Sequence, residues 1–88
     1  MRWRAGALAD LRSFHDWLET IAGANPKATI ARIRAAAESM QRLGDIGRPG
    51  LEQGLRELSV RNAPYVIVYR AVGDAIDILA VYHMAQER

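Results

Sequence analysis

Residues 65–83 have the sequence YVIVYRAVGDAIDILAVYH, and this stretch decides the fold class of the 88-residue chain. Its two halves, 65–71 and 75–83, are rich in β-branched and aromatic side chains, which favour strands. Gly73-Asp74 between them is typical of a tight hairpin turn, and a turn this short joins antiparallel strands. Residues 55–60 supply a third, shorter strand signal. We therefore predict an antiparallel meander of three strands at the C-terminal end.

Two amphipathic helices precede the meander. Residues 6–22 and 26–43 each place apolar side chains at helical spacing. Between them, Gly23 can end the first helix, Asn25 is a favoured N-cap, and Pro26 fits the first helical position. We therefore expect an αα-hairpin. Its predicted core positions are Leu8, Leu11, Phe14 or His15, Leu18 and Ile21 in the first helix, and Ile30, Ile33, Ala37, Met40 and Leu43 in the second.

Length and composition indicate one domain, residues 1–88, with an α+β fold. A short apolar start at Trp3 adds a short N-terminal strand, and the Gly-rich residues 44–54 read as a long loop. The absence of cysteine excludes disulfide scaffolds, Cys-ligated zinc, iron–sulfur clusters and thiol catalysis. The sequence has neither a signal peptide nor an apolar run long enough to cross a membrane. We expect a cytoplasmic protein without a cofactor.

The basic residues are unusual in kind. Eleven of the twelve are arginine, Lys27 is the sole lysine, and the net charge is +2. Arginine suits phosphate and carboxylate partners, but compositional bias explains the same pattern, since fifteen residues are alanine. The sequence has no dense basic stripe of the kind that binds nucleic acid through its phosphates. Sequence-specific DNA binding by this chain is therefore not predicted.

Neither C-terminal strand has a clean polar face. A helical hairpin covers one side of a small antiparallel sheet, which leaves the second face partly apolar. We interpret the second face as a groove for a partner; the alternative is a sheet that curls shut with help from the loop 44–54. Simple alternation groups Tyr65, Ile67 and Tyr69 against Val66 and Val68 in the first strand, and Ile76, Ile78, Ala80 and Tyr82 against Leu79 and Val81 in the second.

The order strand, two helices, three strands resembles the RelE/ParE superfamily of toxins from type II toxin–antitoxin systems. The resemblance covers nearly the whole chain and depends on an ordered set of short pieces, none of which is specific alone. They are Trp3 with Ala7-Leu8-Ala9-Asp10-Leu11, Asn25-Pro26, Gly47-Arg48-Pro49-Gly50, Gly54-Leu55-Arg56-Glu57-Leu58, Pro64-Tyr65-Val66-Ile67-Val68-Tyr69-Arg70, and Ile76-Asp77-Ile78-Leu79 leading to His83.

Two activities divide that superfamily. RelE-like members cut messenger RNA in the ribosomal A site, whereas ParE-like members poison DNA gyrase through protein contact. The Gly-Arg-Pro-Gly loop, the Arg-Glu-Leu strand and the closing His resemble the ParE branch more closely. The resemblance thus implies a growth-arresting toxin of the plasmid-stabilisation kind that inhibits gyrase and is neutralised by a cognate antitoxin.

The alternative function is a ribosome-dependent endoribonuclease. Such an enzyme needs a base for the 2′-oxygen, an acid for the leaving oxygen and cations for the developing charge. His83 would serve as base or acid, with Tyr82 or Glu57 as the weaker second group, while Arg56 and Arg70 would hold the phosphate. The lysines that ribosome-dependent members typically carry near the sheet are missing here. This departure favours a protein target over ribosome and mRNA.

Each candidate residue also has an ordinary structural explanation. Arg56 can cap the edge of the core, Arg70 can project toward a partner, and a terminal His83 is commonly solvated. Trp17 lies beside the apolar stripe of the first helix and is expected to be part of the core. We expect no metal site at His15, on the view that it has no second ligand at i+4.

Overall fold

The computed structural model describes residues 1–44 and 46–86. It confirms the α+β fold, with two helices packed on one sheet of strand order β1-β5-β4-β3-β2. Neither helix of the described chain combines the length and apolarity needed to cross a membrane. The elements are β1 (Arg2–Trp3), α1 (Ala5–Glu19), α2 (Pro26–Leu43), β2 (Arg48–Pro49), β3 (Arg56–Ser59), β4 (Tyr65–Val72) and β5 (Ala75–His83).

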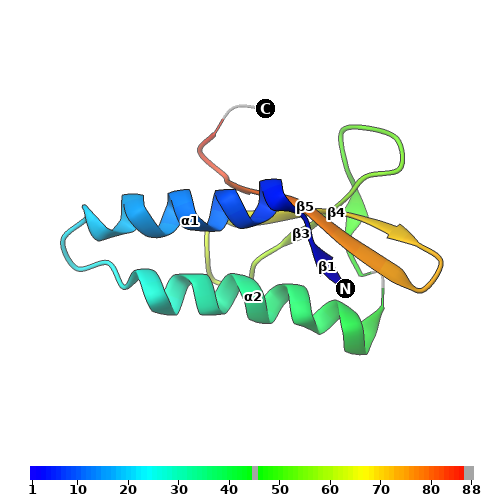
Figure 1. The fold of residues 1–88 in the computed structure, drawn as a ribbon, viewed down its shortest axis with the longest axis horizontal. Coiled ribbons are helices and arrows are strands. Elements are labelled where there is room, and N and C mark those ends of the chain that lie inside the picture. Colours follow the sequence, from blue (N-terminus) through cyan, green and yellow to red (C-terminus); the bar gives the residue numbers. More distant parts are fainter. Residues whose placement is uncertain (45, 87–88) are drawn as a thin grey trace.

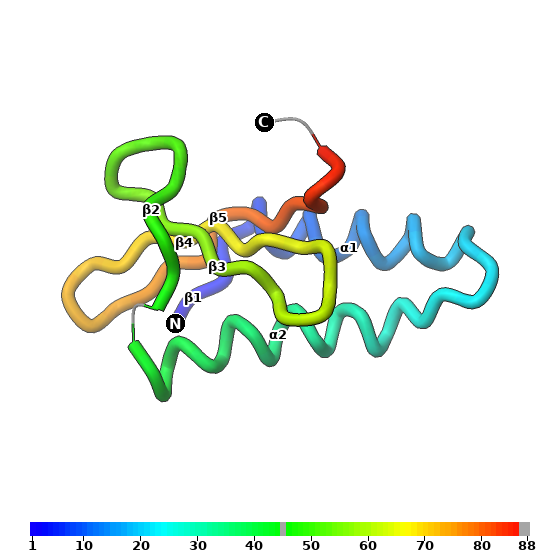
Figure 2. The backbone as a smooth tube through the Cα atoms, turned by 180° about the vertical axis from the view of Figure 1, so that it is seen from behind, coloured from blue at the N-terminus to red at the C-terminus, as the bar shows by residue number. Residues whose placement is uncertain are grey.

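The helices run antiparallel and side by side, with the sheet packed against one side of the pair (Figure 1). The turn between α1 and α2 projects beyond the sheet in both views (Figures 1 and 2). The loop between β2 and β3 stands out from the opposite end (Figure 2). The α1–α2 turn and the β2–β3 loop therefore both project from the body of the molecule.

The sheet is mixed, because β1 adds to the edge of the predicted meander in parallel with β5. The meander itself is antiparallel, as expected. The segment 44–54 was expected to be only a loop, but its residues Arg48 and Pro49 pair with β3 as a second edge strand. Proline is compatible with this position because an edge strand leaves one side of its backbone unpaired.

The connection between the helices follows the predicted turn chemistry. The side chain of Asn25 accepts a hydrogen bond from the Ala28 N–H at 3.1 Å, so it caps α2 as expected. Gly44 ends α2 with a positive φ of 82°. Helix α1 ends earlier than predicted, because the Thr20 N–H and hydroxyl both donate to the Trp17 carbonyl and close the last turn.

One apolar core lies between the helices and the sheet. From α1 it takes Ala7, Leu11 and Phe14, and from α2 it takes Ile33, Ala37 and Met40. Three predicted core positions, Leu8, Ile21 and Leu43, are exposed instead. Ile21 lies beyond the end of α1, in the turn that projects past the sheet, Leu43 is the last residue of α2, and near the start of α1 the buried residue is Ala7 rather than Leu8. The residues that complete the core are Val60, Tyr65, Ile67, Tyr69, Ile78 and Val81.

A β-bulge in β5 changes which side chains share a face. Val68 is opposite Ala80, but the next residue, Tyr69, is opposite Ile78, so Leu79 has no partner on β4. Ile78 therefore faces the helices, whereas Ala80 faces away, and the predicted grouping of these two residues was wrong. Ile76 and Tyr82 were predicted to share one face, but they lie on opposite faces. Ile76 packs on the core, whereas Tyr82 lies with Ala80 on the outer face.

Helix α1 also contacts the backbone of β5 two residues beyond this bulge. The Asp10 carboxylate accepts a hydrogen bond from the Val81 N–H at 2.9 Å. Asp10 was expected on the exposed face of its helix, but it is half-buried against β5. A backbone donor left without a sheet partner is costly to bury, so this contact stabilises the irregular strand.

Candidate functional site

The outer face of the sheet, which points away from the helices, carries a polar network. Glu57 on β3 is only 5% exposed, and its Oε1 accepts hydrogen bonds from Arg48 Nη2 and from the Tyr82 hydroxyl, both at 3.2 Å. Arg48 also donates from Nη1 to Ser59 Oγ at 2.8 Å. Arg48 thus lies along β3, and the network links strands β2, β3 and β5.

This network alters the expected apolar groove. Val66 on the outer face is 1% exposed, although it is outside the core between helices and sheet. In register it lies between Ser59 and Tyr82, both members of the polar network. The centre of the outer face is therefore covered by this chain's own side chains, and it is not an open groove.

Removal of the Arg48 guanidinium should destabilise the fold. Arg48→Met leaves the buried Glu57 carboxylate without that donor, at an expected cost of about 1–3 kcal/mol in the free energy of unfolding. The cost stays below that of a fully buried pair because the Arg48 side chain is half-exposed. Urea unfolding measures it, with Arg61→Met as the exposed control, expected within about 0.5 kcal/mol of the wild type. The double variant Arg48→Met/Glu57→Leu should recover part of the lost free energy of unfolding. A double variant as destabilised as Arg48→Met alone would contradict this account.

Arg56 lies on the other face of β3, toward the helices. Its Nη2 donates a hydrogen bond to the Gly47 carbonyl, and the Gly47 N–H donates to the Tyr69 hydroxyl at 2.7 Å. A Cβ at residue 47 would lie 2.5 Å from the Glu57 carbonyl oxygen, which explains the glycine of the Gly-Arg-Pro-Gly loop. Arg56 therefore helps to hold β2 on the sheet edge, in agreement with its structural interpretation.

Arg70 is exposed on the outer face, opposite Asp77 on β5. Asp77 in turn accepts hydrogen bonds from Arg2, the nearer at 3.2 Å, which ties β1 to β5. This hydrogen bond, together with the charges of Arg2, Arg4 and Arg70, lowers the pKa of the Asp77 carboxyl below its ordinary value of 3.8 despite some desolvation. The Arg70 side chain is thus one of several arginines, with Arg2 and Arg4, that act on Asp77 near the β1 edge of the sheet.

The lowered pKa of Asp77 predicts a pH-dependent contribution to stability. Since the folded state favours the charged carboxylate, the contribution is fully present above pH 3.8 and is lost as the pH falls through the lower folded-state pKa. Asp77→Asn should therefore lower the urea midpoint at pH 7, and the difference from the wild type should shrink below pH 3.8. A difference that stays constant down to the acid transition would contradict the assignment.

His83 ends β5 on the helix side of the sheet. Its ring makes edge-to-face contacts with Tyr65 and Trp17, with centroids 5.1 and 5.8 Å apart. Its Nδ1 accepts a hydrogen bond from the Ala85 N–H at 3.0 Å, so the neutral ring carries its proton on Nε2. Burial raises the pKa of the adjacent Tyr65 hydroxyl. The ring is held by packing and by the backbone that follows it.

The structure does not bring Arg56, Arg70 and His83 to one point. Arg56 is opposite Tyr69 in register, and Arg70, the next residue of β4, points to the other face of the sheet. His83 is opposite Tyr65, four residues along β4, which corresponds to about 13 Å of strand. Of the second groups considered for RNA chemistry, Tyr82 and Glu57 contact each other on the outer face.

Trp17 was expected to be part of the core, but it is 47% exposed. Together with His83 it separates two surface hollows. One of about 400 Å³ lies toward Ser13 and Gln86, and one of about 220 Å³ lies toward Arg32 and the turn before β4. Exposed tryptophans beside hollows are common in protein recognition surfaces. The helical period of α1 contains one sign of this exposure, since Trp17 lies to the side of the apolar stripe that contains Phe14 and Leu18.

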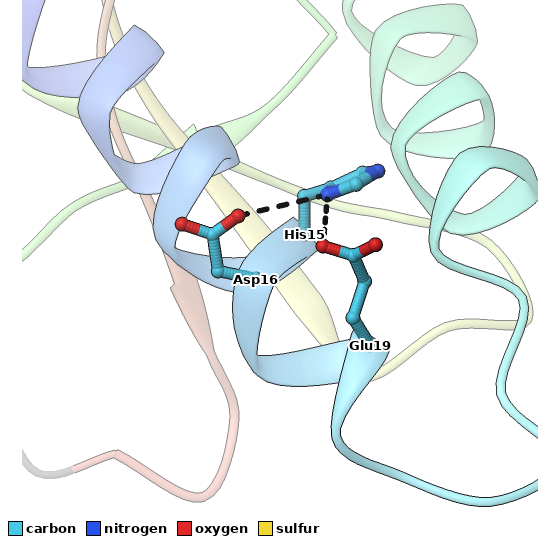
Figure 3. Close-up of side chains that lie close together, drawn as sticks. All are labelled: His15, Asp16 and Glu19. Carbon is cyan, nitrogen blue, oxygen red and sulfur yellow. Dashed lines mark ion pairs between the residues drawn. The ribbon is translucent and has the colours of Figure 1, made fainter.

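The premise behind the expectation about His15 was wrong, because a possible second ligand, Glu19, stands at i+4. His15 Nδ1 lies 3.5 Å from a Glu19 carboxylate oxygen and 3.8 Å from an oxygen of Asp16 (Figure 3). These three side chains form a cluster whose possible ligand atoms all lie within 4.8 Å of one another. The sequence alone shows a carboxylate four residues after His15, and this possible ligand is missed when only histidine and cysteine are considered as partners.

Comparison with known proteins agrees with this geometry. Residues 1–88 match the family described as "ParE toxin of type II toxin-antitoxin system, parDE". The chain is 32% identical over 87 residues to Y4kP of Sinorhizobium fredii (strain NBRC 101917 / NGR234), which is named as a candidate toxin; the match covers 99% of this chain and 90% of Y4kP. A chain of the chromosomal ParDE TA system from P. aeruginosa superposes with a TM-score of 0.70 at 25% identity, covering 93% of this chain and 91% of that one. The protein belongs to the ParE toxin family of type II toxin–antitoxin systems.

Proposed function

We propose that this ParE-family chain inhibits DNA gyrase by direct protein contact and that a cognate antitoxin neutralises it. The observation that carries the proposal is the separation of Arg56, Arg70 and His83, the residues an RNA-cleaving relative would need together. Membership of the ParE family supports the gyrase target, since the ParE-like resemblance implies it. The chain acts in this view as a binding protein in the cytoplasm.

The local contacts of these residues argue against RNA cleavage. A general base needs a lone pair directed at the substrate, but His83 Nδ1 is occupied by the Ala85 N–H and its other ring nitrogen carries the proton. Arg56 donates to the Gly47 carbonyl beside the core. Of the three residues Arg56, Arg70 and His83, only Arg70 is exposed. One exposed guanidinium cannot supply the several cationic contacts that a phosphorane requires.

The surface around Trp17 has features that suit protein contact. It combines a half-exposed indole, the edge of the His83 ring and hollows on both sides. Tryptophan is the residue type most enriched among interface hot spots, because it buries a large area at low entropic cost. We assign the gyrase contact to this surface, which comprises Ser13, Phe14, Trp17, His83 and Gln86.

Assays with purified gyrase test the proposal. The chain should inhibit supercoiling and raise the amount of gyrase–DNA cleavage complex, and the variant Arg70→Ala should retain most of that inhibition because Arg70 performs no chemistry and is not part of the Trp17 surface. Primer extension on translated mRNA should show no A-site cleavage. Unaltered gyrase activity, together with A-site cuts that Arg70→Ala abolishes, would replace this proposal with the endoribonuclease.

Neutralisation is tested separately, by co-expression with the antitoxin. The chain alone should arrest growth, and the neighbouring short reading frame that encodes a DNA-binding fold with a disordered tail should restore growth. A co-purified complex of the two proteins is the expected biochemical result. Growth arrest that the neighbouring product does not relieve would contradict the antitoxin assignment without affecting the gyrase assay.

A further inference from the structure

The last turn of α1 gathers one imidazole and two carboxylates at the surface. Figure 3 shows the Asp16 and Glu19 carboxylates on either side of His15, with dashed lines to the same ring nitrogen. Core residues on the opposite side of the helix, Phe14 and Leu18, hold this turn against the rest of the protein. The cluster therefore lies on an anchored helix and not on a loop.

The spacing of these groups matches what a small metal ion requires. Nitrogen and oxygen ligands bind Zn²⁺ at about 2.0–2.2 Å, and tetrahedral angles then place neighbouring ligand atoms about 3.4 Å apart. His15 Nδ1 lies 3.5 Å from Glu19 Oε1 and 3.8 Å from Asp16 Oδ1. All three possible ligand atoms lie within 4.8 Å of one another, so rotations of these side chains would bring them to ligand distances.

The electrostatic setting of the cluster also favours a cation. Asp16 and Glu19 lie at the C-terminal end of α1, where the helix dipole is negative and acidic side chains are unfavourable. The last turn contains no basic residue that would compensate. Arg12 and Arg34 line a hollow that His15 borders, but the two carboxylates are not part of that hollow. With a neutral imidazole, the cluster has two negative charges and no cation of its own.

We propose that His15, Asp16 and Glu19 bind a divalent transition-metal ion of the Zn²⁺ type. His15 Nδ1 and one oxygen of each carboxylate are the ligands, and the remaining position is open to water or to a side chain of a partner. One nitrogen ligand makes the site selective for Zn²⁺, Ni²⁺ or Cu²⁺ over Mg²⁺ and Ca²⁺, which prefer oxygen alone. The inference is independent of the gyrase proposal, because Trp17 and His83 take no part in it.

Calorimetric titration of Zn²⁺ into the untagged, full-length protein tests the site. The chain has two histidines and no cysteine, so His83→Gln is a matched control for His15→Gln. One Zn²⁺ should bind per chain. His15→Gln should weaken binding at least about tenfold, the isosteric Glu19→Gln and Asp16→Asn should weaken it as well, and His83→Gln should leave it unchanged. Circular dichroism at 222 nm confirms that each variant is folded.

Two results would overturn the proposal. Zn²⁺ binding that survives in His15→Gln but is lost in His83→Gln would move the site to the end of β5. The lack of any saturable Zn²⁺ binding, or equal binding of Mg²⁺, would show that His15 makes only ion pairs with Asp16 and Glu19. Cobalt(II) gives an independent readout, since its paramagnetism should broaden NMR signals of residues 12–20 before those of β5.

Discussion

Ile67→Ala is expected to lower the free energy of unfolding by about 2–5 kcal/mol. Ile67 is completely buried at the centre of β4, between Leu58 on β3 and Val81 on β5, and it packs beneath the helical hairpin. Truncation removes apolar contact and leaves a cavity that rigid neighbours cannot fill. For a domain of this size, the loss corresponds to a fall of at least about 10 °C in Tm.

Urea unfolding of Ile67→Ala beside Leu51→Ala checks this expectation. Leu51 lies in the loop between β2 and β3 and is 74% exposed, so its truncation should change the free energy of unfolding by less than about 0.5 kcal/mol. A loss below 1 kcal/mol at Ile67 would mean that the sheet and the helices do not share one core. Equal losses at the two positions would contradict the assigned burial.

Trp17→Ala is expected to weaken the action on gyrase by at least about thirtyfold, the effect of losing an interface hot spot worth about 2 kcal/mol. The indole lies between two surface hollows and against the edge of His83, where a partner can enclose it. The measurement is the concentration of purified chain that half-inhibits gyrase supercoiling. This prediction depends on the proposed function and on the surface assigned to it.

The fold should withstand this change, since Trp17 is half-exposed and outside the main core. Tm measurements on the variant separate a lost contact from a lost fold. Leu51→Ala is the matched control, because it removes another exposed apolar side chain at the opposite end of the molecule. Full inhibition by Trp17→Ala, or equal loss in Leu51→Ala, would exclude the Trp17 surface as the gyrase contact.

The helical hairpin could be predicted from the sequence where local chemistry decides it. The bounds of α2 follow from the Asn25 cap, Pro26 at the first position and Gly44 at the end, and all three behave as expected. The exposure of Leu8, Ile21 and Leu43 could not be predicted in this way. A helical stripe shows which side chains share a face, but only the length of the sheet decides how much of that face is covered.

The sheet shows the same limit. Alternation correctly separated Tyr65, Ile67 and Tyr69 from Val66, because β4 is regular up to that point. It failed in β5, where the bulge at Leu79 places Ile78 and Ala80 on opposite faces. A bulge shifts the period of two by one residue.

The site residues were harder to place than the fold. The strand pattern predicted a structural role for Arg56 at the edge of the core. Its contact with the Gly47 carbonyl could not be predicted, because it depends on the pairing of β2 and β3. The burial of Glu57 and the exposure of Trp17 are products of tertiary packing, and neither has a local signature. The His15 and Glu19 pair was present in the sequence at helical spacing and could have been found there.

Direct binding of purified gyrase to the immobilised chain tests the central claim, action through protein contact, most directly. In the absence of ribosomes, gyrase should bind saturably to the wild type and to Arg70→Ala, and at least about thirtyfold more weakly to Trp17→Ala. Absence of gyrase binding in an experiment where the same chain binds ribosomes and cuts mRNA would contradict the account.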